Sequence, residues 1–219
     1  ATATINDQGE FVAELPALPG SYTVYTVTLS SENETVTLNN VLIGELWLSA
    51  GQSNMELKVS QDLKKDELLA QVTSDTVRGD NIRIYSSDAL EVDKSYTPVR
   101  EVENAHWKLG SSTQDIASVS AVGYAFALEM FDRLNSDGAT VPVGLLSVTK
   151  GGSQIGAWLS RDVFENTTSY VSEKWPPIYR EDNWNQADGF WKSTQETAMY
   201  NHYIYPLSSL NIGGMLWYQ

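Results

Sequence analysis

The chain has 219 residues, of which 42% are hydrophobic, contains no cysteine and carries a formal net charge of −14 at pH 7. This composition is typical of a globular protein with a sizeable core, and it excludes disulfides and cysteine-based zinc sites. The negative charge argues against a nucleic-acid partner, and no apolar run approaches the roughly 20 residues that a membrane span requires.

The first 42 residues have the alternating pattern of antiparallel strands. Polar and apolar residues alternate over 10–15, 21–29 and 34–38, and segments rich in Pro, Gly, Ser and Asn separate these stretches. A period of two predicts three antiparallel strands. Three strands form a thin sheet with two open edges. We therefore expect residues 1–42 to be part of a β-sandwich whose other strands lie outside this chain.

From residue 43 onward, strand and helix patterns alternate. Helical periodicity covers 62–72 and 119–134, and short apolar runs predict strands at 43–49, 81–85, 141–148 and 213–218. This alternation predicts an α/β fold, a three-layer α/β/α sandwich with a parallel sheet. In the flavodoxin-like strand order 2-1-3-4-5, the first and third strands are neighbours, and ligands bind beyond their carboxyl ends.

Ser53 follows the first strand of this α/β region, between Gln52 and Asn54. A serine at the end of a buried strand can act as a nucleophile if a base and an oxyanion hole converge on it. The simpler interpretation is a serine that caps the following helix. The chain lacks the Gly-x-Ser-x-Gly elbow of α/β-hydrolases.

A glycine pair, Gly151-Gly152, follows the third predicted strand. The pair can be simply a tight turn, or one of its backbone N–H groups can stabilise a developing oxyanion, a contribution of about 3 kcal/mol. Because the first and third strands are expected to be neighbours, Ser53 and the glycine pair are predicted to lie on the same rim of the sheet.

Several segments resemble, in the same order, the SGNH-type carbohydrate esterases. The similarity is greatest to the sialate O-acetylesterase family, with bacterial acetylxylan esterases as relatives. Residues 44–55, which contain Gly-Gln-Ser-Asn-Met, resemble the first block of the family, and residues 151–155 resemble the second. Further similar segments are 119–124, 199–207 and 213–219.

The resemblance implies an esterase domain over residues 43–219, preceded by the partial β-sandwich of residues 1–42. It implies Ser53 as the nucleophile and the N–H groups of Ser53 and Gly152 as oxyanion donors. Gln52, Asn54 and Gly151 are expected on the substrate side. The substrate would be an acetylated carbohydrate, either O-acetyl sialic acid or acetylated xylan and hemicellulose. The sequence has no paired histidines, phosphate loop or dinucleotide fingerprint, so we expect no cofactor and no metal.

Only two histidines are present, His106 and His202, and neither matches a catalytic block of the family. A serine hydrolase ordinarily needs a histidine base that a carboxylate holds. The resemblance places this base in an Asp-x-x-His motif, downstream of a Gly-Glu-Ser-Asn block that follows the last predicted strand. We therefore expect a C-terminal remainder of the same protein to supply the base, and we interpret both histidines as surface or packing residues.

An alternative function is a catalytically inactive, carbohydrate-binding relative on the same scaffold. One segment is rich in tryptophan and tyrosine, and its pattern predicts a long loop followed by a helix over 191–203. Its aromatic side chains could bind the face of a sugar, although such residues are more often buried in the core. The aromatic residues in question are Trp175, Tyr179, Trp184 and Trp191.

The net charge bears weakly on the substrate. A protein of charge −14 does not attract anions over long distances, which favours neutral xylan over anionic sialic acid. Salt screens this effect beyond about 8 Å, and Arg161 or Arg180 could form a local carboxylate clamp. We expect a secreted or periplasmic location, or a lysosomal or extracellular one in a eukaryote.

Overall fold

The structure, a computed structural model, describes residues 1–7, 9–87, 97–163 and 196–219. The strands of this part are β1 (Ser21–Ser30), β2 (Thr35–Ile43), β3 (Glu45–Gly51), β4 (Ile82–Ser87), β5 (Ala105–Leu109), β6 (Val143–Thr149) and β7 (Gly214–Tyr218). The α-helices are α1 (Ser53–Glu56), α2 (Lys65–Ser74), α3 (Thr76–Asn81), α4 (Thr113–Ala117) and α5 (Ala121–Leu134). The other short helical segments are η1 (Val59–Gln61), η2 (Ile155–Trp158), η3 (Tyr200–Ile204) and η4 (Tyr205–Leu207).

Five strands form the central sheet in the order β5-β4-β6-β3-β7. β4, β6, β3 and β7 are parallel, and β5 is antiparallel to β4 at one edge. The predicted neighbours, the first and third strands of the α/β region, do pair, as β3 and β6. The flavodoxin-like order is wrong in its outer positions, because β4 lies beyond β6 and β7 takes the other side of β3. Sequence periodicity predicts a strand but not which neighbour it takes.

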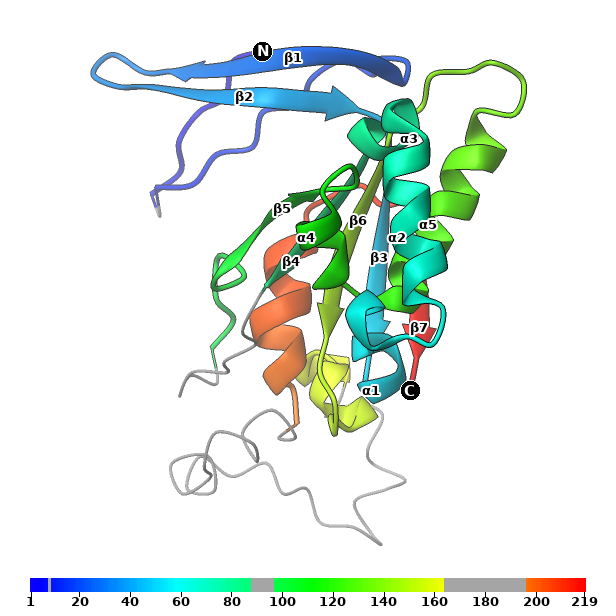
Figure 1. Cartoon of the computed structure of the whole chain (residues 1–219). Helices are drawn as coiled ribbons and strands as arrows, with labels where there is room; N and C mark the ends of the chain where they lie inside the picture. Colours follow the sequence, from blue (N-terminus) through cyan, green and yellow to red (C-terminus); the bar gives the residue numbers. More distant parts are fainter. Residues whose placement is uncertain (8, 88–96, 164–195) are drawn as a thin grey trace, which may run out of the picture.

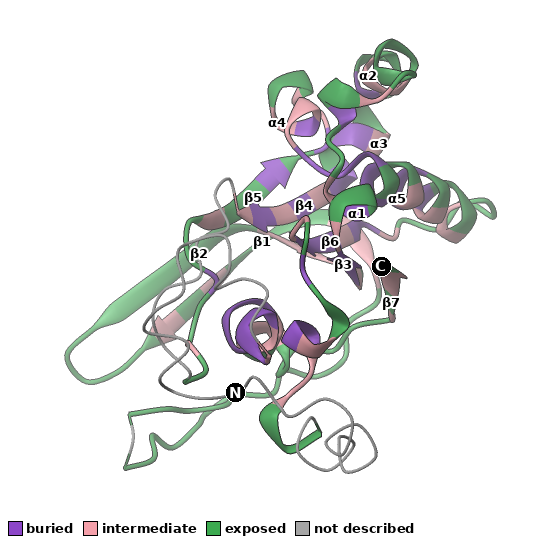
Figure 2. Cartoon of the chain, turned by 90° about the horizontal axis from the view of Figure 1, so that it is seen from below, coloured by how far each residue is buried: buried purple, intermediate pink, exposed green. Residues whose placement is uncertain are grey.

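The sheet separates two hydrophobic cores, which makes three layers (Figure 1; Figure 2). Consecutive strand residues point to opposite faces. Leu145 therefore packs in the core beneath α5 and α2, whereas Leu146 packs in the other core, with η2 and η3. The predicted three-layer α/β/α sandwich is confirmed.

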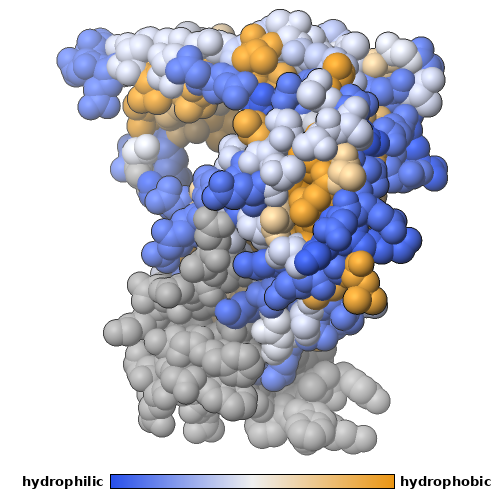
Figure 3. Space-filling view, in the orientation of Figure 1, coloured by the Kyte–Doolittle hydropathy of each residue, from blue (hydrophilic) through white to orange (hydrophobic). Residues whose placement is uncertain are grey.

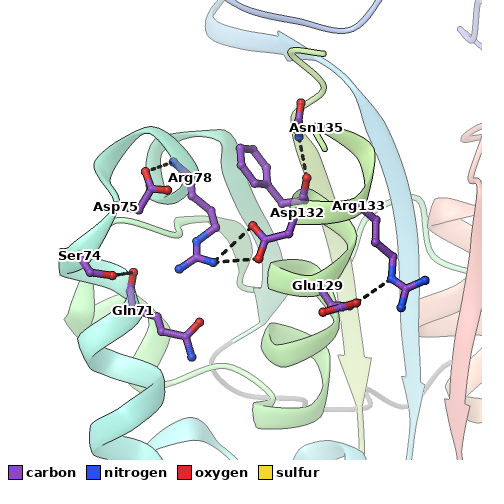
Figure 4. Close-up of polar contacts among 9 residues, drawn as sticks. Gln71, Ser74, Asp75, Arg78, Glu129, Asp132, Arg133 and Asn135 are labelled. Carbon is purple, nitrogen blue, oxygen red and sulfur yellow. Dashed lines mark hydrogen bonds and ion pairs between the residues drawn. The ribbon is translucent and has the colours of Figure 1, made fainter. Parts of the chain in front are cut away.

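Helix α5 begins where a hydroxyl can cap it. The Ser120 hydroxyl accepts a hydrogen bond from the Gly123 N–H at 3.1 Å, and Ser120 also forms a β-bridge with Lys58, so the helix starts at Ala121 rather than at the predicted residue 119. Its exposed side carries an ion pair between Glu129 and Arg133, at 2.7 Å. An ion pair between Arg78 and Asp132 ties α3 to the same helix (Figure 4).

Helix α2 lies close to its predicted range of 62–72, at Lys65–Ser74. The segment just before it is the 3-10 turn η1. The predicted helix over 191–203 is helical in its described part, from Ala198 into η3, and its first residues lie outside the described ranges. The long loop predicted around 173–184 also lies outside them.

The N-terminal region forms a two-stranded antiparallel hairpin, β1 with β2. The predicted strand over 10–15 is wrong: residues 10–20 form no strand. Alternation indicates which side chains share a face, but it does not supply a pairing partner. Apolar residues are exposed on the hairpin, among them Val24, Val36 and Leu38. Figure 3 shows hydrophobic surface in this part of the molecule. Membership of a β-sandwich stays a prediction.

The hairpin is fixed to the α/β layer near its base. Tyr22 stacks on Phe131 of α5, with ring centroids 5.9 Å apart, and the Arg83 guanidinium donates to the Asn40 side-chain oxygen at 2.8 Å. Only Gly44 separates β2 from β3. The division of the chain into domains at residue 42 stays a prediction. Among the described residues, no helix is long and apolar enough to cross a membrane.

Candidate active site

Ser53 stands at the carboxyl end of β3 because Gly51 allows the chain to turn there. Gly51 has a φ of +143°, and a Cβ at this position would lie 2.2 Å from the Tyr218 carbonyl oxygen. The Gln52 N–H donates to that same oxygen at 3.0 Å. Strand β3 thus ends against β7, and Ser53, two residues after Gly51, is exposed at the start of α1.

The Ser53 side chain does not cap the helix. Gln52 holds the N-cap position, and its carbonyl accepts from the Met55 and Glu56 N–H groups at 2.8 and 2.9 Å. The Ser53 hydroxyl instead donates to the Gln52 side-chain oxygen at 3.3 Å. Its contact is therefore with a neighbouring amide and not with the helix backbone, so the capping interpretation is wrong.

The glycine pair lies at the same end of the sheet. In the last rung between β3 and β6, Gly51 pairs with Thr149, and the Lys150 N–H continues the ladder by donating to the Gly51 carbonyl at 2.9 Å. A Cβ on Gly151 would lie 3.7 Å from the Ser53 Cα. The predicted convergence of the serine and the glycine pair on one rim is therefore present.

The two glycines differ in what their N–H groups contact. The Gly151 N–H donates to a carboxylate oxygen of Glu56 at 2.7 Å, so it is already engaged. Gly152 has a φ of +77° and is exposed. Within the described ranges, neither its N–H nor that of Ser53 donates a hydrogen bond. An oxyanion hole requires N–H donors that have no other acceptor and point at one oxygen position.

Three side chains fix the loop that carries the glycine pair. The Ser153 hydroxyl donates to the Lys150 carbonyl at 2.7 Å and accepts from the Trp158 indole N–H at 2.9 Å. The Gln219 amide donates to the Ser153 carbonyl at 3.0 Å. Trp158 itself is buried and packs edge-to-face on Trp217, with centroids 5.3 Å apart.

Neither histidine contacts the serine. His106 is exposed on β5, opposite Ser86, and β5 lies three strand positions from β3, or about 14 Å at the usual strand spacing. His202 is buried in η3, with its ring tilted against Tyr203. Both behave as the surface and packing residues that the sequence predicted.

The three residues predicted on the substrate side differ in their contacts. Asn54 is exposed beside Ser53, Gln52 binds the Ser53 hydroxyl, and Gly151 gives its N–H to Glu56. Their predicted contacts with substrate stay predictions. In the part of the chain that the structure describes, no group of three or more His, Asp or Glu residues could hold a metal ion.

Glu56 was not among the predicted site residues. Its position three residues after Ser53 was a signal, because residues three apart on a helix share a face. The Arg161 of the predicted carboxylate clamp is exposed just beyond η2. Outside the described residues lie Arg180 and the aromatic candidates Trp175, Tyr179, Trp184 and Trp191.

A family model described as carbohydrate esterase, sialic acid-specific acetylesterase matches residues 43–219. The chain belongs to this family. The matched range covers the whole central sheet, the Ser53 turn and the glycine pair.

Known relatives agree with this assignment. The chain is 28% identical to the sialate O-acetylesterase of Mus musculus, over 88% of this chain and 37% of the relative. It is 26% identical to that of Homo sapiens, over 88% of this chain and 34% of the relative. This chain thus spans little more than a third of the length of these relatives.

Its fold is similar to the crystal structure of a carbohydrate acetylesterase from Xanthomonas citri. The TM-score is 0.71 at 24% identity, over 97% of this chain and 40% of that one. The similarity confirms the α/β fold of the esterase family.

Proposed function

We propose that this chain carries the nucleophile and the oxyanion donors of a serine esterase that removes O-acetyl groups from carbohydrates. One observation carries the proposal. The Ser53 hydroxyl and the Gly151-Gly152 turn meet at the carboxyl ends of two adjacent parallel strands, which is where α/β sheets bind ligands. Membership of the carbohydrate esterase family supports the reaction class.

In the first half of the reaction, the Ser53 oxygen attacks the acetyl carbonyl carbon. The serine proton passes to a general base, and the carbonyl oxygen takes up the negative charge of the tetrahedral intermediate. The N–H groups of Ser53 and Gly152 stabilise that charge, and each such donor contributes about 3 kcal/mol. When the intermediate collapses, the sugar oxygen leaves with a proton from the base, and an acetyl-serine remains.

In the second half, water attacks the acetyl-serine and gives its proton to the same base. The Ser53 oxygen then leaves and recovers a proton, and acetate is released. We propose that this base is a histidine from the C-terminal remainder of the same protein. Support comes from the relatives, which are more than twice as long as the matched segment. It also comes from His106 and His202, neither of which hydrogen bonds to Ser53.

For the substrate, we propose neutral acetylated xylan ahead of O-acetyl sialic acid. The formal charge of −14 disfavours an anionic sugar over long distances. The relatives are named sialate O-acetylesterases, so the rates of hydrolysis of both substrates should be compared side by side. Faster hydrolysis of O-acetyl sialic acid than of acetylated xylan would overturn this preference.

A second candidate is a carbohydrate-binding relative without catalytic activity. One observation favours it: within the described residues, the Ser53 hydroxyl contacts only the Gln52 amide, and no histidine hydrogen bonds to it. Sugar binding that persists without acetate release would support this function over the esterase.

The deciding experiment measures acetate release from acetylated xylan by the full-length protein that contains this chain. We expect Ser53→Ala to lower turnover by at least 1,000-fold, on the order that the loss of a serine nucleophile costs. Ser60→Ala provides the matched control, because Ser60 is also exposed and lies in η1, the short helical segment that follows α1. Full activity in Ser53→Ala would refute the esterase mechanism.

We also propose that the protein works outside the cytoplasm, in a secreted or periplasmic location, or in a lysosome or outside the cell in a eukaryote. The lack of cysteine is compatible with an oxidising compartment. Cell fractionation that recovers the protein only from the cytoplasm would contradict this location.

A further inference from the structure

We infer that Glu56 is a positioning residue that sets the glycine loop in the geometry needed for catalysis. This inference rests on the proposed function, and it concerns a residue to which the family assignment gives no role. The Glu56 carboxylate accepts the Gly151 N–H at 2.7 Å. That bond joins the helix that carries the nucleophile to the loop that carries the oxyanion donor.

The contact has the features of a strong hydrogen bond. Its length lies in the range of charge-assisted bonds between an N–H and a carboxylate. It is part-buried, and burial reduces competition from water. Its two partners are 95 residues apart in the sequence, so no local turn imposes the contact. The bond spans two loops that share no other side-chain hydrogen bond among the described residues.

Glu56 is itself held in place. It is the last residue of α1, and its N–H donates to the Gln52 carbonyl at 2.9 Å. Because residues three apart lie on one side of a helix, its side chain follows the same face as Ser53. A displacement of Glu56 would therefore change the nucleophile and the glycine loop together.

The bond also decides which glycine can serve as an oxyanion donor. It uses the Gly151 N–H and leaves the Gly152 N–H, one peptide further, without an acceptor within the described ranges. A Cβ on Gly151 would lie 2.5 Å from the Glu56 carboxylate oxygen, so a side chain there would displace the end of the Glu56 side chain and disturb this bond. At Gly152 the φ of +77° itself favours glycine.

Transition-state stabilisation depends on such preorganisation more than substrate binding does. If the carboxylate orients the loop, its loss will lower kcat and leave KM nearly unchanged. Any acceptor of the same reach will preserve the loop. Glutamine keeps an oxygen at the same distance and lacks the charge, whereas aspartate keeps the charge and is one methylene short.

The test compares Glu56→Ala, Glu56→Asp and Glu56→Gln in the full-length protein that contains this chain, with 4-nitrophenyl acetate and acetylated xylan as substrates. We expect kcat to fall 10- to 100-fold in Glu56→Ala and 5- to 20-fold in Glu56→Asp, and to stay within 3-fold of the parent in Glu56→Gln. KM should change less than 3-fold in all of them. Glu129→Gln is the control, because that exposed carboxylate pairs with Arg133 on α5 and has no proposed role at the site.

Two outcomes overturn the inference. One is a kcat in Glu56→Ala within 2-fold of the parent. The other is an equal loss in Glu56→Ala and Glu56→Gln, which would mean that the charge acts rather than the hydrogen bond. If Glu56→Ala does not fold, the comparison of Glu56→Asp with Glu56→Gln decides the matter.

A second readout does not depend on activity. Amide hydrogen exchange at Gly151 should be at least 10-fold faster in Glu56→Ala than in the parent, with Glu56→Gln close to the parent. Unchanged exchange overturns the inference. Turnover that survives in Ser53→Ala would refute the proposed esterase instead, so the two failures are distinguishable.

Discussion

Gly51 and Tyr218 touch at the point where the edge of the sheet meets the candidate site. A Cβ on Gly51 would lie 2.2 Å from the Tyr218 carbonyl oxygen, and the φ of Gly51 is +143°. A side chain at this position would therefore both strain the backbone and push β7 away from β3. The turn that presents Ser53 depends on the close approach of two neighbouring strands.

Gly51→Ala should accordingly destabilise the fold far more than an ordinary glycine replacement. We expect a loss of at least about 3 kcal/mol, because backbone strain of about 1–3 kcal/mol adds to a clash with main chain that cannot rotate away. Gly138→Ala is the matched control: Gly138 also has a positive φ, of +87°, but nothing lies within 4 Å of its Cβ position. Urea unfolding of both variants measures the difference, and equal losses would contradict the clash.

Ser153→Ala should weaken both stability and activity. The change leaves the buried Trp158 indole N–H without its acceptor and removes the hydroxyl that donates to Lys150. A buried donor without a partner costs about 1–3 kcal/mol. Ser136→Ala is the control, because the exposed Ser136 hydroxyl also donates to a carbonyl three residues earlier. Thermal melting and esterase assays check the pair, and a loss in Ser136→Ala as large as that in Ser153→Ala would contradict this account.

The Arg78–Asp132 ion pair should contribute more than the Glu129–Arg133 pair on the same helix (Figure 4). The Arg78 side chain is only 13% exposed and bonds from α3 to α5 at 3.1 Å, whereas both partners of the second pair are more than 60% exposed. We expect a coupling free energy of about 1 kcal/mol for the first pair, and of about 0.3 kcal/mol for the second. Double-mutant cycles with alanine measure both.

Those cycles also have a salt control. Raising the ionic strength should reduce the coupling of the exposed pair first, because exposed charges are screened and partly buried ones less so. Equal coupling in both pairs at low salt would show that the burial of Arg78 adds nothing.

Tyr124 should make the fold sensitive to alkaline pH. Burial in the core beneath α5 raises the pKa of this phenol to about 12, from an ordinary value near 10. Because the folded pKa is the higher one, the stabilisation is complete below pH 10 and is lost as the pH rises toward 12. The loss is at most about 3 kcal/mol, since one pKa unit corresponds to about 1.4 kcal/mol.

Tyr124→Phe should remove this part of the alkaline transition. Urea unfolding at pH 7, 9, 10 and 11 would follow it, and the difference in stability between the variant and the parent should be constant up to pH 9. A parent protein that loses stability above pH 10 no faster than Tyr124→Phe would contradict the raised pKa.

Much of this architecture was predictable, because periodicity and turn residues act locally. The apolar runs predicted strands over 43–49 and 141–148, whose ends lie within two residues of those of β3 and β6. The rule that parallel strands expose their carboxyl ends on one rim then brought Ser53 and Gly152 together.

The errors concern contacts between distant segments. Nothing in the pattern of residues 82–87 tells whether β4 lies beside β3 or beyond β6, because both places bury the same apolar faces. The alternation at residues 10–15 predicted a strand that has no partner. The Glu56–Gly151 contact was missed for the same reason, since it joins residues that are 95 positions apart.

The pairing of β3 with β6 has a consequence for how the protein acquires activity. The Ser53 hydroxyl and the glycine N–H groups come from distant segments that strand pairing and the Glu56–Gly151 hydrogen bond hold together. Such non-local contacts form slowly because a long loop must close first. During refolding, recovered turnover should lag behind the helical circular dichroism signal. A chemical probe of the serine would thus report on completion of the native topology.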